Sequence, residues 1–460
     1  MKSLHDRRRF AAVIRILAGT TLAIFVWTVF SLIPTCPADD PECKVALAPQ
    51  FDKNWIEDST LNVYDAERGL VEKEEEIHGF EPALNNAVSV VKPFRPYGDT
   101  RFAAHAPGFS VIENAYWRND TWYLITAKPW SFPSMSLVVS NAPDHKEKVF
   151  TDDSVVRVLS KKEAHDAGLD IDNAEDNDGT SLIFNDRIYL DHFYHLTGEM
   201  FLGAWRMFTS MVDIESDSVL DKLPEITGLV FAHVKPDTVF DHAGLNKFFL
   251  KRFFPNAKWE FQAEWQARAD TGKLYRFERV IIADRKCGHA GGGISKPMDK
   301  AFETPVPQNW LSDLKQRVLE SYTGPVSLDD PAHANPDAKP VITYLSRQTA
   351  AHRRLRDEVH QALIDGLATL KEEDIAEVHV EEFTDADPKD EQVAKLSRTT
   401  ILVGLHGNGL TNLLWMTLDA HGRSTVFEIQ QKGMFLDDYA VLSEALGMEH
   451  WIIGGRSNLE

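Results

Sequence analysis

The stretch from residue 401 to residue 415 constrains the fold of this 460-residue chain more than any other. It reads Ile-Leu-Val-Gly-Leu-His-Gly-Asn-Gly-Leu-Thr-Asn-Leu-Leu-Trp, an apolar run that gives way to closely spaced glycines before apolar residues resume. This pattern predicts a buried strand, a tight glycine turn and the first turn of a helix. The first N–H groups of a helix lack partners and lie at the positive end of its dipole, so such a turn suits a phosphate.

The residues of this glycine turn are therefore candidates for binding a phosphate-bearing ligand. Glycine allows the main chain to approach an anion closely, because no Cβ stands in the way. His406 opens the turn, and its imidazole could either donate to a phosphate or cap the turn. The predicted contacts come from His406, Gly407, Asn408, Gly409, Leu410, Thr411 and Asn412.

Strands and helices alternate on both sides of the glycine turn. Strands are predicted over residues 341–345, 376–383, 401–405 and 425–429, and helices over residues 352–370, 392–398, 409–416 and 436–446. Such alternation predicts an α/β fold with a parallel, doubly wound sheet, whose ligand binds at the carboxyl ends of the strands. The glycine turn is at such an end.

Two arginines are expected near the same edge of the sheet. Arg347 follows the strand 341–345, and Arg353 lies at the start of the next predicted helix. A guanidinium stays charged and matches a phosphate with two parallel hydrogen bonds, so both arginines are predicted to bind a diphosphate. The stretch around Arg353 could instead be a solvated helix face that pairs with Asp357 and Glu358.

Glu428 lies near the end of the predicted strand 425–429. A carboxylate at that place could accept hydrogen bonds from both hydroxyl groups of a ribose. It could also be an ion-paired residue with no ligand contact. The first interpretation, together with the arginines and the glycine turn, favours a nucleoside diphosphate as the ligand.

A second group of polar residues lies in the N-terminal half, in the sequence Asp-His-Phe-Tyr-His-Leu-Thr-Gly-Glu that ends at Glu199. His195 and Glu199 are four residues apart in a helix predicted over residues 195–212, so their side chains share one face. His192 comes just before them, after a strand predicted over residues 182–190. An imidazole and a carboxylate that face a cleft could deprotonate an alcohol. The alternative is a structural pair inside the domain.

The rest of the N-terminal half is predicted to contain short strands. These span residues 122–126, 136–140, 155–159, 227–234 and 275–283. Three Asp-x-Asp pairs, at residues 170–172, 176–178 and 385–387, are expected by chance in so acidic a chain and are interpreted as loops. The glycine-rich stretch 288–293 lacks the spacing of a Walker loop and is interpreted as a flexible loop. We predict no metal site.

The N-terminus differs from the rest of the chain. An apolar stretch follows a basic start, and it predicts an uncleaved transmembrane signal anchor over residues 10–33. The basic residues predict that residues 1–9 form a cytosolic tail and that the chain after the anchor lies on the lumenal side. A cleaved signal peptide is the alternative, but its apolar core is usually shorter.

Residues 34–99 are rich in Pro, Asp and Glu and are interpreted as a stem between the membrane and the folded part. Cys36 and Cys43 lie just outside the predicted anchor, where they could pair with each other or join two chains into a dimer. The formal net charge of −21 and the lack of a basic stripe argue against nucleic acid as a partner.

Several of these motifs together resemble family 61 glycosyltransferases, which include β-1,2-xylosyltransferases and O-linked N-acetylglucosaminyltransferases of the secretory pathway. The resemblance runs from about residue 180 to about residue 450. It rests on residues 344–347, 353–355, 402–412 and 426–429 in the C-terminal half, and on residues 191–199 and 281–285 in the N-terminal half.

The resemblance implies a GT-B fold, in which two Rossmann-like domains face a cleft. Residues 100–325 would form the acceptor-side domain and residues 326–460 the domain that binds the nucleotide sugar. It implies an inverting transfer from a UDP-sugar, xylose or N-acetylglucosamine, without a metal or other cofactor. By position, Arg347 and the amides around Asn408 to Thr411 would hold the diphosphate, Glu428 the ribose, and His195 or Glu199 would be the base.

The expected protein is thus a type II membrane glycosyltransferase of the Golgi or the endoplasmic reticulum. Its acceptor would be a hydroxyl group of a glycan or glycoprotein. A catalytically inactive, membrane-tethered carbohydrate-binding or scaffold protein of the same fold is the alternative. Another nucleotide-dependent transferase, such as a sulfotransferase, is disfavoured by the lack of a Walker-like loop.

Overall fold

The computed structural model describes residues 98–291, 296–320, 339–350, 353–416, 424–431 and 436–454. The predicted cytosolic tail, the transmembrane anchor, Cys36 and Cys43 lie outside the described residues, as does nearly all of the stem. The predicted domain boundary between residues 325 and 326 also lies outside them. Within the described ranges, every helix is too short or too polar to cross a bilayer.

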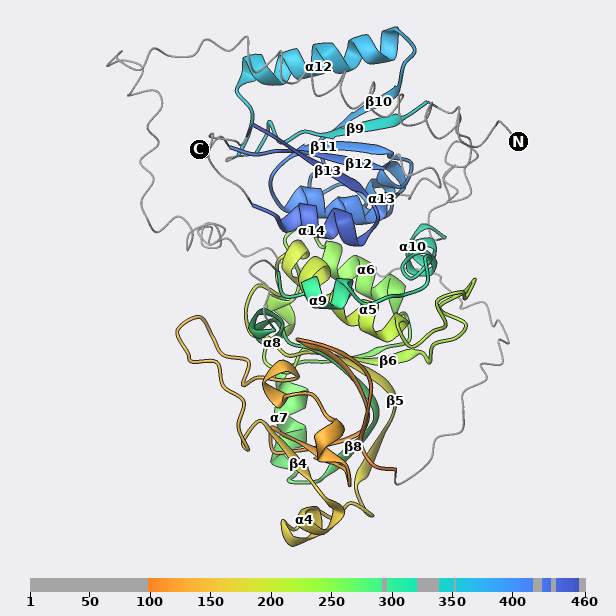
Figure 1. The fold of residues 1–460 in the computed structure, drawn as a ribbon. Helices are drawn as coiled ribbons and strands as arrows, with labels where there is room; N and C mark the ends of the chain where they lie inside the picture. Colours follow the sequence, from red (N-terminus) through yellow and green to blue (C-terminus); the bar gives the residue numbers. More distant parts are fainter. Residues whose placement is uncertain are drawn as a thin grey trace, which may run out of the picture.

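The N-terminal half is built on an eight-stranded mixed sheet (Figure 1). Its order is β4-β3-β2-β8-β5-β6-β7, with β1 paired to β2. Strands β8, β5, β6 and β7 run parallel, whereas β2 is antiparallel to β1, β3 and β8. The strands are β1 (Arg101–Ala106), β2 (Phe109–Arg118), β3 (Thr121–Ile125), β4 (Val156–Leu159), β5 (Glu175–Phe184), β6 (Ile226–Val230), β7 (Lys258–Glu260) and β8 (Tyr275–Ala283).

The antiparallel part of this sheet departs from the wholly parallel Rossmann-like domain that the resemblance implied. Its cause is a meander of tight hairpins at the start of the described chain. Asn119 and Asp120 connect β2 to β3 and have φ angles of 50° and 60°, as two-residue hairpin turns of the primed type require. Gly108 connects β1 to β2 with a φ of 80°. These short connections allow only antiparallel pairing.

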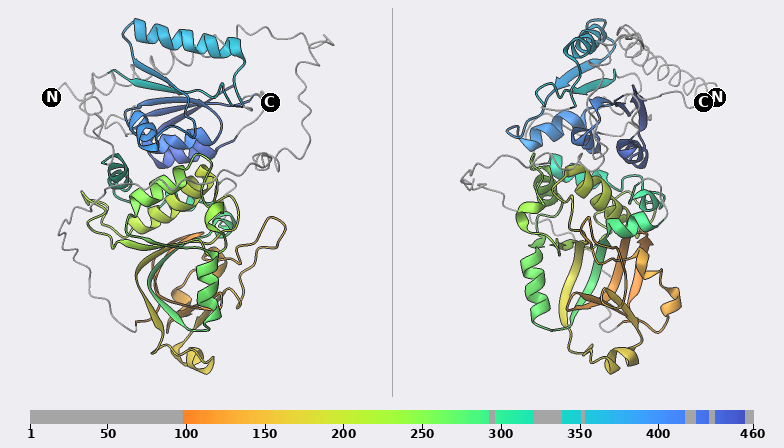
Figure 2. Two further views of the ribbon diagram at one scale, coloured as in Figure 1. Left: turned by 180° about the vertical axis from the view of Figure 1, so that it is seen from behind. Right: turned by 90° about the vertical axis from the view of Figure 1, so that its left-hand side faces the viewer.

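Helices cover both faces of the N-terminal sheet (Figure 2). Val111 and Ile112, neighbours in β2, point into different apolar cores on opposite faces. On one face, Trp265 of α7 (Gln262–Asp270) packs on Trp117 with ring centroids 4.4 Å apart. On the other face, toward the C-terminal half, α5 (Leu202–Thr209) packs on β1, β2 and β8, and α9 (Asp299–Phe302) packs on β1. The π-helix η3 (Tyr194–Phe201) leads into α5, and α6 (Leu245–Phe253) and α10 (Ser312–Leu319), which pack on each other, lie between the two halves (Figure 1).

The C-terminal half contains a five-stranded sheet that is parallel throughout, with the order β10-β9-β11-β12-β13. Helix α12 (Asp357–Glu372) covers one face, and α13 (Lys389–Ser397), η5 (Asn408–Trp415) and α14 (Asp438–Ala445) lie on the face toward the N-terminal half (Figure 1). The strands are β9 (Val341–Leu345), β10 (Glu377–Glu381), β11 (Ile401–Leu405), β12 (Thr425–Ile429) and β13 (Glu449–Ile453).

This arrangement confirms the predicted parallel, doubly wound sheet. The chain passes from β9 outward to β10 and then back across β9 to β11, so β9 and β11 are neighbours at the point where the winding reverses. Ligands of such sheets bind at the carboxyl ends of the strands beside this reversal. Arg347 follows β9, and the glycine turn follows β11, so both lie at that place.

One apolar core joins the two halves of the chain. It includes Phe201 and Phe253 from the N-terminal half and Leu413 and Trp415 from η5. The rings of Phe253 and Trp415 have centroids 6.3 Å apart. Because the helices pack directly on one another, the carboxyl edge of the C-terminal sheet is held against η3 of the N-terminal half.

Several predicted elements were wrong in detail. Residues 136–140 were predicted as a strand but form none: Met135–Leu137 is the 3₁₀-turn η2. The strand predicted over residues 182–190 is β5, which starts earlier, at Glu175, and ends at Phe184. Asp176 is not in a loop: it lies in β5, where a cross-strand bond of 2.6 Å to Arg276 stabilises it. The stretch 288–293 begins inside helix α8 (Arg285–Ala290).

Candidate functional site

Two charged residues meet at the carboxyl edge of the N-terminal sheet. Asp186 comes two residues after β5, and Arg285 comes two residues after β8, the parallel neighbour of β5. The guanidinium of Arg285 donates from Nε to Oδ2 of Asp186 at 2.9 Å, and its Nη2 lies 2.8 Å from the same oxygen. Both side chains are buried. The sequence analysis missed this pair as a site, although polar residues after adjacent parallel strands are a recognisable signal.

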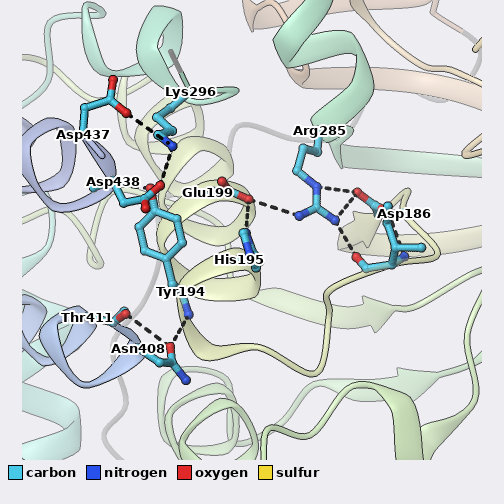
Figure 3. A network of polar contacts seen from close by, with 11 residues as sticks. Asp186, Tyr194, His195, Glu199, Arg285, Lys296, Asn408, Thr411, Asp437 and Asp438 are labelled. Atoms are coloured by element: carbon cyan, nitrogen blue, oxygen red, sulfur yellow. Dashed lines mark hydrogen bonds and ion pairs between the residues drawn. The ribbon is translucent and has the colours of Figure 1, made fainter. Parts of the chain in front are cut away.

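His195 and Glu199 lie on η3 beside this pair, as Figure 3 shows. His195 Nδ1 and Glu199 Oε2 are 2.7 Å apart, which confirms that the two side chains share one face. Arg285 Nη1 donates to the same carboxylate oxygen at 3.1 Å. The side chain of His195 is 24% exposed and that of Glu199 only 6%. Both residues lie in π-helical backbone. π-Helices are rare in proteins, and those that occur are often found at functional sites.

The protonation of the pair follows from its surroundings. Burial alone would raise the pKa of Glu199, but the hydrogen bond and charge of His195 and the charges of Arg285 and Lys296 lower the pKa to about 2. Glu199 is therefore a carboxylate at neutral pH and accepts the hydrogen bond, so Nδ1 of His195 carries the hydrogen. The other ring nitrogen, Nε2, is then left to act on a substrate.

His192 lies next to His195 but in a different setting. It is in the turn before η3 and not directly at a strand end, and the centroids of the two rings are 4.7 Å apart. Burial, followed by the nearby His195, Arg353 and Arg285, lowers the pKa of His192 to about 3. Its Nδ1 is buried and has no hydrogen-bond partner among the described residues. His192 is thus a neutral imidazole with an unused polar atom.

Two arginines converge on the glycine turn of the C-terminal half. Arg347 donates from Nη1 to the carbonyl oxygen of His406 at 3.2 Å. Gly407 has a φ of 144°, and a Cβ at this position would lie 2.1 Å from Nη1 of Arg347 and 3.6 Å from Nη1 of Arg353. Burial and the neighbouring Arg353 cation lower the pKa of Arg347. No carboxylate of the described chain pairs with either guanidinium, so the two like charges leave a place for an anion.

The amino end of η5 presents main-chain donors at the same place. Leu410 N–H donates to Gly407 O at 2.9 Å, whereas the N–H groups of Asn408 and Gly409 have no acceptor within the described ranges. Gly409 is exposed, and a Cβ there would meet nothing within 4 Å. The side chains of Leu410, Thr411 and Asn412 are buried, and Asn412 donates to Gly409 O at 3.0 Å. These three side chains shape the turn, while Gly409 is exposed and Asn408 is half-buried against Tyr194.

Glu428 is fully buried at the end of β12. His406 Nδ1 forms a hydrogen bond with Glu428 Oε1, and His450 Nε2 lies 2.9 Å from Glu428 Oε2. Burial raises the pKa of Glu428, but the hydrogen bonds and charges of these two histidines outweigh it and lower the pKa. In this arrangement Glu428 orients His406 and offers no accessible oxygen to a ribose. The sequence did not reveal His450, which β13 brings beside β12.

The two groups of residues are joined directly. The N–H of Tyr194, the residue before His195, donates to Asn408 Oδ1 at 3.1 Å, and the Tyr194 hydroxyl donates to Asp438 O at 3.2 Å. Lys296 forms ion pairs with Asp438 and, at 3.4 Å, with Asp437 (Figure 3). The imidazole of His195 in the N-terminal half therefore lies beside the glycine turn of the C-terminal half.

A family model described as Glycosyltransferase 61 matches residues 171–421, which is more than half of the chain. The chain belongs to glycosyltransferase family 61. The matched range holds both the His195–Glu199 pair and the glycine turn, whereas Glu428 lies beyond it. A comparison with curated proteins found no match to the chain.

This family 61 glycosyltransferase contains no cluster of His, Cys, Asp and Glu that could hold a metal ion within the part of the chain that the structure describes. The cations near the glycine turn are those of its own side chains, Arg347 and Arg353. Independence of metal stays a prediction.

Proposed function

We propose that this family 61 glycosyltransferase transfers a sugar from a UDP-sugar to a hydroxyl group, with inversion at the anomeric carbon. The observation that carries the proposal is the hydrogen bond from Tyr194 N–H to Asn408 Oδ1, 3.1 Å long. It ties the residue next to His195 to the turn where cations and free N–H groups converge. A base and an anion site in contact are what an inverting transfer to an acceptor hydroxyl requires.

The leaving diphosphate is assigned to the C-terminal half. Nη1 atoms of Arg347 and Arg353 lie beside Gly407, and the next two residues, Asn408 and Gly409, have free N–H groups. Neither guanidinium is neutralised by a carboxylate of the described residues. Negative charge builds up on the diphosphate as the glycosidic bond breaks. Donors that are already in place stabilise such charge without reorganisation, and this is usually the largest contribution to catalysis.

His195 is assigned as the base. Its Nε2 takes the proton of the acceptor hydroxyl while the oxygen attacks the anomeric carbon from the face opposite UDP, and the bond from that carbon to the diphosphate oxygen breaks with its electron pair on UDP. Glu199 is less suited, because its side chain is only 6% exposed and the pKa is lowered to about 2. A carboxylate so weakly basic orients the imidazole and does not take the proton itself.

The fold layout, the sugar, the acceptor and the membrane anchor of the proposal are supported chiefly by the sequence. Two α/β halves that meet at the site fit the GT-B layout, and the resemblance favours xylose or N-acetylglucosamine as the sugar and a glycan or glycoprotein as the acceptor. The apolar residues 10–33 support a type II anchor in the Golgi or the endoplasmic reticulum.

Calorimetry with UDP on the detergent-solubilised full chain tests the donor site. We expect micromolar binding that EDTA leaves unchanged and that Arg347→Ala weakens by about tenfold to a hundredfold, as the loss of a charged hydrogen bond implies. Arg354→Ala is the matched control, because Arg354 is exposed and adjacent to Arg353. UDP release from UDP-xylose and UDP-N-acetylglucosamine then tests turnover. A folded chain that binds glycans but neither UDP nor these donors would refute the proposal and favour a carbohydrate-binding scaffold.

A further inference from the structure

Arg285 is a buried cation that contacts two carboxylates at once. It lies between Asp186 and Glu199, and its Nη2 also donates to the carbonyl oxygen of Ile188. Asp186 is itself fixed, because its second oxygen accepts from the N–H groups of Arg187 at 2.7 Å and of Ile188 at 3.0 Å. The guanidinium therefore has a rigid support on one side and the partner of His195 on the other.

We propose that Asp186 and Arg285 are positioning residues that hold Glu199 in place and thereby set how readily His195 accepts a proton. This inference rests on the proposed function, in which His195 is the base. Neither residue needs to touch the substrate: both act through Glu199, whose Oε2 receives Arg285 Nη1 at 3.1 Å and His195 Nδ1 at 2.7 Å.

The charges of Asp186, Arg285 and Glu199 explain why Asp186 and Arg285 are present beside Glu199. Asp186, Arg285 and Glu199 together carry one net negative charge in a site with almost no exposed surface. When His195 takes a proton the whole group becomes neutral, so proton uptake removes a buried charge and does not create one. Without Asp186, the same step would leave an uncompensated cation, which burial disfavours.

Tyr189 encloses the group. Its ring lies 4.9 Å from the guanidinium carbon of Arg285, and its ring centroid is also 4.9 Å from that of His195. The φ of Tyr189 is 62°, a conformation that a bulky side chain rarely adopts. Strain of this kind persists where the surroundings enforce it, and it clusters at functional sites. The ring covers the ionic contacts and keeps water from weakening them.

Other charged and titratable groups around His195 also act on its charge. They are His192 and Tyr194 beside it in the chain, His289 on α8, Lys296, and Arg353 from the C-terminal half. Each remains unchanged in the variants below, so a change in the behaviour of His195 reports on Asp186 and Arg285.

The test measures the reaction of His195 with diethyl pyrocarbonate, which modifies a histidine only in its neutral form. The full chain is treated over a range of pH, and tandem mass spectrometry that locates the modification on His195, apart from His192 in the same fragment, gives the pH of half-maximal reactivity. Asp186→Asn removes a negative charge and disfavours the imidazolium, so this midpoint is expected to fall by roughly one pH unit. Arg285→Gln removes a positive charge, and the midpoint is expected to rise by a similar amount.

Midpoints that shift in opposite directions in Asp186→Asn and Arg285→Gln would show that the two residues act on His195 through their charges. If the two residues were merely structural, both variants would shift toward the midpoint of a histidine in the unfolded chain. Arg279→Gln is the matched control: Arg279 is on β8 too and pairs with Glu113 at 3.2 Å, away from His195. Its midpoint should equal that of the unmodified chain. Arg285→Lys keeps the charge, so its midpoint should lie close to that of the unmodified chain and lack most of the shift of Arg285→Gln.

Unshifted midpoints in both folded variants, or shifts of the same sign, would overturn the inference. That failure differs from a failure of the proposed function, which would appear as absent UDP binding and absent UDP release in the unmodified chain. With an active chain, UDP release from the donor panel should also fall in both variants while UDP affinity stays within about twofold, since neither residue contacts the glycine turn in the structure.

Discussion

Replacing Gly407 with alanine tests the geometry of the anion site most directly. Gly407 has a φ of 144°, which residues with a Cβ rarely adopt, and the new methyl group would lie 2.1 Å from Nη1 of Arg347. Relaxing the backbone or holding it strained costs about 1–3 kcal/mol. The guanidinium must also move, which breaks its bond of 3.2 Å to the carbonyl oxygen of His406. One substitution should therefore reduce both stability and anion binding.

The expected magnitudes can be worked out. A strain of 1–3 kcal/mol lowers the midpoint of thermal unfolding by about 2–4 °C for each kcal/mol in a domain of this size. Displacement of Arg347 removes a charged hydrogen bond to the diphosphate, about 1.5–3 kcal/mol, which corresponds to about a tenfold to hundredfold weaker UDP affinity. Thermal unfolding and calorimetry on the full chain measure the two effects separately.

Gly409→Ala is the matched variant in the same turn. A Cβ at residue 409 would meet nothing within 4 Å, so the thermal midpoint should remain that of the unmodified chain. If the donor approaches the main chain here, UDP affinity should nevertheless fall, because the methyl group points into the space that the ligand needs. Equal stability and equal UDP affinity of Gly407→Ala and the unmodified chain would refute the reasoning.

Three further predictions concern the base and the donor site. His195→Ala should reduce UDP release from a UDP-sugar by about 10²- to 10⁴-fold while calorimetry still shows UDP binding; a parallel loss of binding would contradict its role as base. The folded-state pKa of Glu199 is lowered from its ordinary 4.5 to about 2. The ionised carboxylate therefore makes its full contribution to the free energy of unfolding above about pH 4.5, and this contribution is lost as the pH falls toward 2. The thermal midpoint of Glu199→Gln should accordingly lie below that of the unmodified chain at pH 6, and the gap should shrink at pH 3; a constant gap would argue against an ionised Glu199. EDTA should leave UDP affinity unchanged, and a metal requirement in the same titration would show that the arginines are not sufficient.

The C-terminal half could be predicted well from the sequence because local pattern and fold agree there. The predicted strands 341–345, 401–405 and 425–429 match β9, β11 and β12 residue for residue. Buried parallel strands are continuous apolar runs bounded by turn residues, which makes their ends visible. Helix α12 begins at Asp357 and not near residue 352, because the chain is extended at Arg356 and Arg353 has a φ of 54°.

The strands of the N-terminal half and the partners of the site residues could not all be predicted, because they depend on contacts between segments that are far apart in the sequence. The residues of β1 and β2 mix polar and apolar side chains, so no strand was predicted there. Asp186 and Arg285 are 99 residues apart and meet only because β5 and β8 are neighbours. Glu428 was expected to bind a ribose, but which residue faces it depends on β13, which brings His450 to its carboxylate. Pairing between distant strands decides each of these contacts.

The arrangement also resolves a conflict between the two tasks of the site. An arginine disfavours a proton on a nearby imidazole, and His192 shows this in part: burial first, then His195, Arg353 and Arg285, lower its pKa to about 3. His195 lies only 4.7 Å away, ring to ring, yet it is bonded to the carboxylate of Glu199. His195 first and then Arg285 lower the pKa of that carboxylate and keep it ionised, and Asp186 balances the charge of Arg285. In the proposed mechanism, the base beside the cationic glycine turn therefore has a buried counter-charge, and of the two adjacent imidazoles His195 alone is bonded to one among the described residues.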